Sequence, residues 1–92
     1  MDAIQEERRG EEAQILLGNA LYKESWREVR ERLVTMLEQP GIKPEEREQL
    51  NCALVGLRAA RRYLEQVVAT GTMSAMETQR KRTLADRVLR RA

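Results

Sequence analysis

The fold is decided by residues 44–70, which read PEEREQLNCALVGLRAARRYLEQVVAT. On a helix of 3.6 residues per turn, this stretch is apolar over one broad side and leaves only a narrow strip for water. The broad side is made of Leu50, Ala53, Leu54, Leu57, Ala60, Leu64, Val67 and Val68. A surface helix needs an apolar stripe of only about 100°. We therefore expect other helices of this chain, or other copies of it, to cover this helix from two directions.

Signals for a helix start and a helix end flank this stretch. Pro44, followed by Glu45 and Glu46, suits a first turn, because proline fits the first helical position and acids favour the positive end of the helix dipole. Gly71 is the expected glycine at the end of the helix. The short segment 39–43, Gln-Pro-Gly-Ile-Lys, predicts a tight connection to an antiparallel neighbour.

Residues 20–38 predict that neighbour, a solvated helix with one apolar seam and with Asn19 as its N-cap. We expect an αα-hairpin of residues 20–38 and 44–70. Its core, or a subunit interface, would be formed by Tyr22, Trp26, Val29, Leu33, Leu50, Leu54, Leu57, Leu64 and Val68. The small residues Gly56, Ala59 and Ala60 would permit close approach of a further helix.

Two flanking helices of opposite charge complete an all-α prediction. Residues 2–17 predict an acidic helix in which Gly10 interrupts the pattern, so the part before Gly10 should need a partner to become helical. Ser74 and Glu77 fit the spacing of a capping box, which predicts a separate helix over residues 75–91. Residues 1–12 hold five acids against two arginines, net −3, whereas residues 79–92 hold six bases against one acid, net +5.

The whole chain is expected to be a single helical domain, residues 1–92. Within it we distinguish an acidic N-terminal helix or arm (1–18), the helical hairpin (19–71) and a basic C-terminal helix (72–92).

Few residues offer catalytic chemistry. The 92 residues include no His and a single Cys, Cys52, so the usual general base and the usual activator of a thiol are absent. The carboxylates stand in runs such as Glu45-Glu46, which helix starts and solvated faces explain. No phosphate-binding loop or metal-ligand spacing is found. We predict a protein that is not an enzyme and has no catalytic residues, no metal site and no cofactor.

Nothing in the sequence suggests a membrane or secreted protein. No apolar run approaches the roughly 20 residues of a membrane span. The N-terminus, with Asp2, Glu6 and Glu7, lacks the basic and then apolar form of a signal peptide. We expect the protein to remain in the compartment where it is made.

The basic C-terminal helix is the main candidate binding site. Its cationic residues are Arg80, Lys81, Arg82, Arg87, Arg90 and Arg91. They could contact an acidic protein surface, including the acidic N-terminal segment of a neighbouring subunit. They could instead neutralise the phosphates of a nucleic acid, although no aromatic residue stands among them for base stacking. The third possibility is that these cationic residues bind no partner and only face water.

Four motifs resemble those of short helical proteins encoded among the head and DNA-packaging genes of tailed bacteriophages and prophages. They are RGEEA at 9–13, LLGNALY at 16–22, PEEREQL at 44–50 and LEQVVATGTM at 64–73. The resemblance spans residues 8–76 and leaves the final helix outside it. Relatives tend to have Pro where this chain has Ala20. The resemblance implies a small virion or assembly component, located in the virion or in the cytoplasm of the bacterial host.

Taken together, these features predict a non-enzymatic bacteriophage structural or morphogenesis protein. It would dock on other virion subunits, or on sister copies in a homo-oligomer, through its helical faces, and it would not bind membranes. One alternative is a DNA-binding packaging subunit, similar to a small terminase, that uses the basic C-terminal helix. The other is a small phage protein that binds a host factor.

Overall fold

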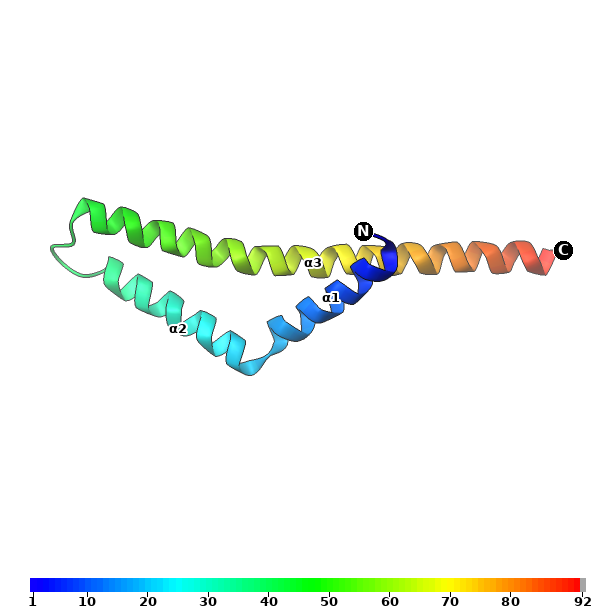
Figure 1. The fold of residues 1–92 in the computed structure, drawn as a ribbon, viewed down its shortest axis with the longest axis horizontal. Coiled ribbons are helices and arrows are strands. Elements are labelled where there is room, and N and C mark those ends of the chain that lie inside the picture. The colour runs from blue at the N-terminus through cyan, green and yellow to red at the C-terminus, as the bar shows by residue number, and fades with distance from the viewer. Residues whose placement is uncertain (92) are drawn as a thin grey trace.

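The computed structural model describes residues 1–91, which form three helices: α1 (Ala3–Gly18), α2 (Ala20–Leu37) and α3 (Pro44–Arg91). The all-α prediction is thereby confirmed for these residues. Figure 1 shows α1 and α2 as two sides of an open triangle, with the first part of α3 as the third side. The rest of α3 projects past the crossing with α1, and the molecule measures 77 × 25 × 18 Å.

Side-chain caps explain where the first two helices begin. Asp2 accepts a hydrogen bond from the backbone N–H of Gln5 at 2.9 Å, and the Gln5 side chain accepts one from the N–H of Asp2 at 3.3 Å. This reciprocal pair satisfies two backbone donors at the start of α1. The predicted cap at Asn19 is confirmed, because its side chain accepts from the N–H of Tyr22 at 2.9 Å. Asn19 itself is extended, which turns the chain between α1 and α2.

The predicted break between two C-terminal helices is wrong. α3 is one helix of 48 residues that continues through Gly71 and Ser74. Gly71 does not end the helix, because it lies directly against the backbone of α1. Ser74 does not cap a new helix, because its hydroxyl donates a hydrogen bond to the carboxylate of Glu6. The predicted interruption of α1 at Gly10 is wrong for the same reason, since Gly10 faces Gly71 at that crossing.

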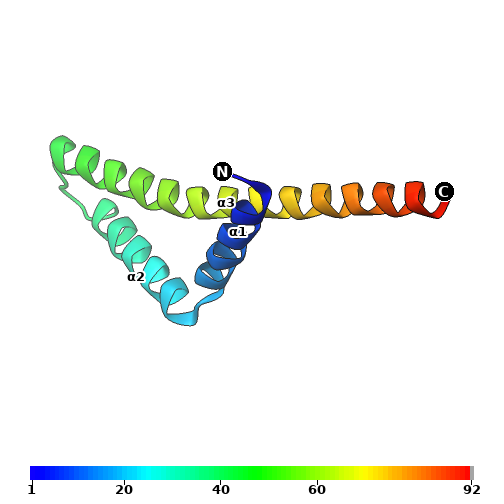
Figure 2. The same cartoon turned by 45° about the vertical axis from the view of Figure 1, so that its right-hand side comes forward.

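The predicted hairpin is present but open. α2 and α3 are antiparallel and joined by residues 38–43, where Gly41 has a positive φ of 79°. Figures 1 and 2, which view the molecule 45° apart, both show the two helices diverging from this loop towards Asn19. Most buried residues lie instead at the crossing of α1 and α3, where Gly10, Ala13, Gly71 and Ser74 are buried. In the hairpin only Leu54 is buried to the same degree.

The fold leaves an unusually large surface. Its accessible area is 7777 Å², whereas a compact monomer of this mass would expose about 5,500 Å². Its radius of gyration is 20.8 Å, against about 12 Å for a compact chain of this length. Among the described residues, no large side chain is fully buried, and no helix is both long and apolar enough to cross a membrane.

Candidate interaction surfaces

The tightest contact in the molecule is the crossing of α1 and α3 at two glycines. A Cβ atom added to Gly71 would lie 2.9 Å from the Glu6 carbonyl oxygen and 2.9 Å from the Gly10 Cα. One added to Gly10 would lie 3.0 Å from the Gly71 Cα. These neighbours are backbone atoms, which cannot rotate aside as a side chain can. The two helices therefore touch backbone to backbone, and only glycine fits at either position.

Polar side chains fix α1 against α3 on one side of the glycine contact. The buried hydroxyl of Ser74 donates to the half-buried carboxylate of Glu6. One turn further along α1, Arg9 Nη2 donates to the Tyr63 hydroxyl at 3.0 Å. Both bonds join residues more than 50 positions apart in the chain. They determine which face of α1 contacts α3.

This crossing of α1 and α3 was not predicted from the sequence, although a signal for it exists. Each helix carries two small residues three positions apart, Gly10 with Ala13 and Gly71 with Ser74, and all four are buried. Residues at this spacing share one helix face and let another backbone approach. The small residues predicted to permit such an approach were Gly56, Ala59 and Ala60. That prediction is wrong for this chain's own helices, since all three are exposed and a Cβ on Gly56 would meet nothing within 4 Å.

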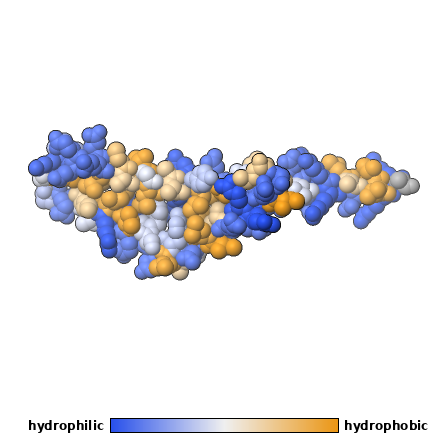
Figure 3. Space-filling view, in the orientation of Figure 1, coloured by the Kyte–Doolittle hydropathy of each residue, from blue (hydrophilic) through white to orange (hydrophobic). Residues whose placement is uncertain are grey.

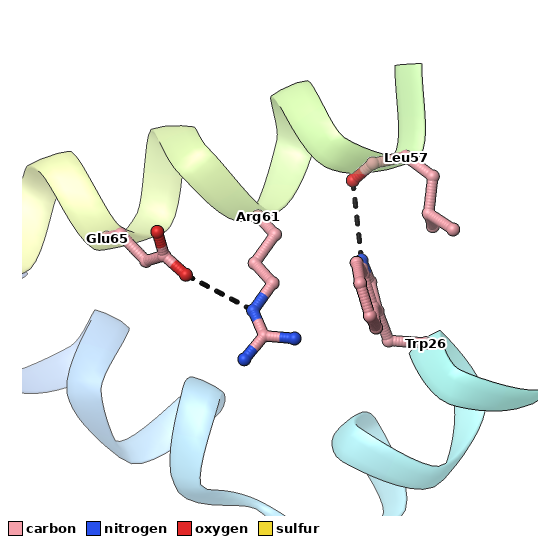
Figure 4. A network of polar contacts seen from close by, with 4 residues as sticks. All are labelled: Trp26, Leu57, Arg61 and Glu65. Carbon is pink, nitrogen blue, oxygen red and sulfur yellow. Dashed lines mark hydrogen bonds and ion pairs between the residues drawn. The ribbon is translucent and has the colours of Figure 1, made fainter. Parts of the chain in front are cut away.

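A polar network joins α2 to α3 (Figure 4). The indole Nε1 of Trp26 donates to the Leu57 carbonyl oxygen at 3.4 Å. The guanidinium of Arg61 stacks on the same indole, with its Cζ 4.5 Å from the ring centroid, and its Nε donates to Glu65 at 3.2 Å. Such a cation–π contact contributes about 0.5–1 kcal/mol at an exposed site. Trp26 is therefore anchored to α3, and the half-buried Arg61 lies between α2 and α3.

The predicted core residues are buried to different degrees. Leu54 is buried, with 8% of its surface exposed. The half-buried ones are Tyr22, Trp26, Leu33, Leu50, Leu57, Leu64 and Val68. Val29 is 45% exposed. Because α2 diverges from α3, its apolar seam contacts α3 only in part.

The basic residues predicted to bind a partner all lie on the part of α3 that projects beyond α1. Arg80, Lys81, Arg82, Arg87, Arg90 and Arg91 are all exposed. Lys81 pairs with Glu77 at 3.7 Å. Successive helical residues are turned by about 100°, so these side chains surround the helix. We call this segment, residues 79–91, the basic arm.

A further exposed surface runs along α3 on the side away from α2. We call it the outer face, and it comprises Cys52, Val55, Ala59, Tyr63, Gln66, Thr70, Met73, Leu84 and Val88, all exposed. Val55 is 64% exposed and Met73 70%. A shallow depression beside Cys52 and Val55 is rimmed by Ile42 and Pro44. Figure 3 shows apolar surface alternating with charged surface along the molecule, including the projecting part of α3.

Chemistry-bearing clusters are lacking on these surfaces. Among residues 1–91, no three His, Cys, Asp or Glu side chains are placed to hold a metal ion. The free Cys52 is exposed on the outer face, without an imidazole beside it because the chain has no His. No protein-family model, curated protein or solved structure compared with the chain matches it. The surfaces that the structure does show are the exposed faces of α1, α2 and α3.

Proposed function

We propose that the chain is a non-enzymatic assembly protein of a tailed bacteriophage or prophage. It docks on other virion subunits or on sister copies through the exposed faces of its helices. The viral origin rests on the resemblance of residues 8–76 to proteins encoded among phage head and packaging genes. The docking role rests on the surfaces described above.

The observation that carries the proposal is the excess of exposed surface. The chain exposes 7777 Å², about 40% more than a compact monomer of its mass. Large exposed apolar side chains occur on every helix, for example Ile15 on α1, Leu21 on α2 and Val55 on α3. Extended apolar surface on a small soluble chain is typical of an interaction site. A subunit that completes its core by assembly accounts for this arrangement.

The basic arm is the proposed contact with an acidic partner surface. Its six cations are opposed within the arm by Asp86 alone. Long arginine side chains on a projecting helix can form bidentate pairs with carboxylates of a neighbouring subunit. Such a contact would orient the chain in the particle, while the apolar faces supply the buried area.

A genetic experiment tests this role. In a phage or prophage that encodes the chain, Arg80, Arg82, Arg87 and Arg90 are changed together to Glu, and purified particles are analysed by peptide mass spectrometry. We expect the wild-type chain in the particles and the loss of the reversed variant from them. The variant should remain helical by circular dichroism, because the four side chains are exposed and form no ion pair within residues 1–91.

A matched control separates this effect from a general change in charge. Reversal of four other exposed arginines, Arg8, Arg27, Arg32 and Arg58, changes the net charge equally. It should leave incorporation intact. Absence of the wild-type chain from both particles and assembly intermediates would contradict the proposal. Equal incorporation of the two variants would exclude the basic arm as the contact.

DNA binding is the second candidate, favoured by the projection of the basic arm away from the rest of the fold (Figure 1). In this case the arm would hold duplex DNA with an affinity that falls steeply with salt concentration. The same four reversals would then abolish DNA binding by the purified protein. Wild-type protein without salt-dependent DNA affinity excludes this candidate.

A further inference from the structure

The outer face of α3 continues as one straight stripe along most of the helix. Its members recur at 3.6-residue spacing between Cys52 and Val88, so they stay on one side without supercoiling. At a rise of 1.5 Å per residue the stripe is about 54 Å long. α2 contacts α3 from another side, and α1 borders the stripe near Tyr63, Gln66 and Thr70, where Arg9 donates to the Tyr63 hydroxyl. The residues of the stripe nevertheless stay exposed. The ion pair of Glu77 with Lys81 is the one charged interruption, and it is internally neutral.

We infer that the outer face of α3 binds the outer face of a second copy of this chain in antiparallel orientation. The inference names the partner in the assembly role proposed above and rests on it. Charge, the residues near the centre of the stripe and the available area together favour a second copy in this direction.

Charge selects the antiparallel direction. The first turn of α3 carries Glu45 and Glu46, whereas its last turn carries Arg90 and Arg91. A parallel pair would place two basic arms, each with a net charge of +5, side by side, and like charges at that distance repel. An antiparallel pair places each basic arm beside the acidic start of α3 in the other copy. It also opposes the two helix dipoles.

The centre of the stripe suits a two-fold axis. Matching the charged ends places the axis near residue 68, where residues of the two copies meet their own equivalents or close neighbours. The stripe residues there, Gln66 and Thr70, are uncharged, so the two copies of α3 bring no like charges of the stripe together at the axis. Glu6 and Arg9 of α1, which have opposite charges, lie at its edge. In this register Tyr63 lies opposite Met73 of the second copy, and Cys52 lies opposite Leu84 of the second copy.

The available area is sufficient for a specific dimer. The strip is about 54 Å long and about 10 Å wide, which is one helix diameter. The two copies together would therefore bury about 1,000 Å². This reaches the lower limit of about 1,000 Å² expected of a biological interface. The exposed side chain of Met1 lies beside the face near Tyr63 and would add apolar area at its edge.

The single native cysteine makes the direction measurable. In the antiparallel pair the two Cys52 residues are about 48 Å apart along the helices, so a short bis-maleimide cannot link wild-type chains. Leu84→Cys introduces a thiol opposite Cys52 of the second copy. We expect this variant to form covalent dimers rapidly, and Leu84 is 54% exposed, so its replacement should leave the fold intact by circular dichroism.

Asp86→Cys is the matched control. Asp86 is exposed and lies two residues, or about 200°, further around the same helix. Its thiol points away from the inferred interface, so its cross-linking should be slower by about tenfold or more. Adding Cys52→Ala to the Leu84→Cys variant should abolish cross-linking, because each link needs one Cys52 thiol and the two remaining thiols at position 84 are about 48 Å apart.

Three results would overturn the inference. Cross-linking of wild-type chains through Cys52 alone indicates parallel pairing. Equal rates for the two introduced cysteines indicate random collision. A monomer at all concentrations, with no covalent dimer, shows that the outer face has another occupant. None of these results affects the incorporation of the chain into particles, which tests the assembly role separately.

Discussion

Gly10 and Gly71 bring the backbones of α1 and α3 into direct contact, whereas side chains hold most helix pairs 8–10 Å apart. Glycine inside a helix costs about 0.5–1 kcal/mol relative to alanine, because the unfolded chain gains freedom. The crossing offsets this cost through close packing and through the bond from Ser74 to Glu6. At the residue scale, the position of α1 depends on the absence of two methyl groups.

Gly71→Ala should release α1 from α3. The added Cβ would lie 2.9 Å from two backbone atoms of α1, so the helices must separate. Overpacking of this kind costs about 1–3 kcal/mol, which exceeds the gain in helix propensity of up to about 1 kcal/mol. Amide hydrogen exchange over residues 3–18 should accelerate, and urea unfolding should occur at lower concentration.

Gly56→Ala is the control in the same helix. A Cβ there meets nothing within 4 Å, so only the gain in helix propensity, up to about 1 kcal/mol, should remain. Unfolding should therefore shift to higher urea concentration. A Gly71→Ala variant as stable as Gly56→Ala would contradict the crossing.

The role of these residues in the crossing could not be predicted from the sequence. Glycine and serine end helices and cap them, but they also permit close contact between helices, and the local pattern is the same in both cases. Gly71 and Ser74 lie at a helix contact because Glu6 and Gly10, more than 60 residues away in the chain, are opposite them. No local rule contains that information.

At the element scale, α3 combines two functions in one continuous helix. Its first half packs against α2, its middle crosses α1 at Gly71 and Ser74, and its last turns form the basic arm. Continuity makes the arm a rigid extension of the triangle (Figure 1). A break at Gly71 would instead have left the arm as a separate helix joined by a loop.

Proline at position 75 distinguishes the two arrangements. In a separate helix Ala75 would be the first helical residue, where proline is tolerated. In the continuous α3 it is an interior position, where proline costs about 3 kcal/mol. We expect Ala75→Pro to destabilise the protein by about that amount in urea unfolding followed by circular dichroism.

Ala20→Pro serves as its control. Ala20 is the first residue of α2, and the preceding Asn19 already has the extended backbone that proline requires. Little change in stability is expected. If Ala75→Pro were tolerated as well as Ala20→Pro, α3 would not be a single helix in solution.

Much of the secondary structure was predictable because local signals are unambiguous there. The start of α3 at Pro44, the loop at Pro40 and Gly41 and the cap at Asn19 follow from residue chemistry alone. The hairpin followed from the short loop. The angle between α2 and α3 could not be predicted from the short loop, because it depends on where α1 crosses α3.

At the scale of the whole molecule, the open triangle leaves apolar faces that one chain does not cover. If a second copy covers the outer face, light scattering should give twice the 10.7 kDa mass of one chain. The mass should persist at high salt, because burial of apolar area does not depend on screening. Charge contacts at the ends would weaken, so the dissociation constant should rise without loss of the dimer. Complete dissociation by salt would show that charge alone holds the copies together.

The exposed surface of the triangle has a consequence for how stability varies with temperature. Folding removes only about half of the roughly 15,500 Å² that the extended chain exposes. The heat capacity change of unfolding scales with newly exposed apolar area, which is small here. The stability curve of a single chain should therefore be shallow, with little difference between cold and warm conditions. If a second copy covers the outer face, unfolding exposes more apolar area and the stability curve becomes more strongly curved. The heat capacity change of unfolding therefore measures how completely the chain is assembled.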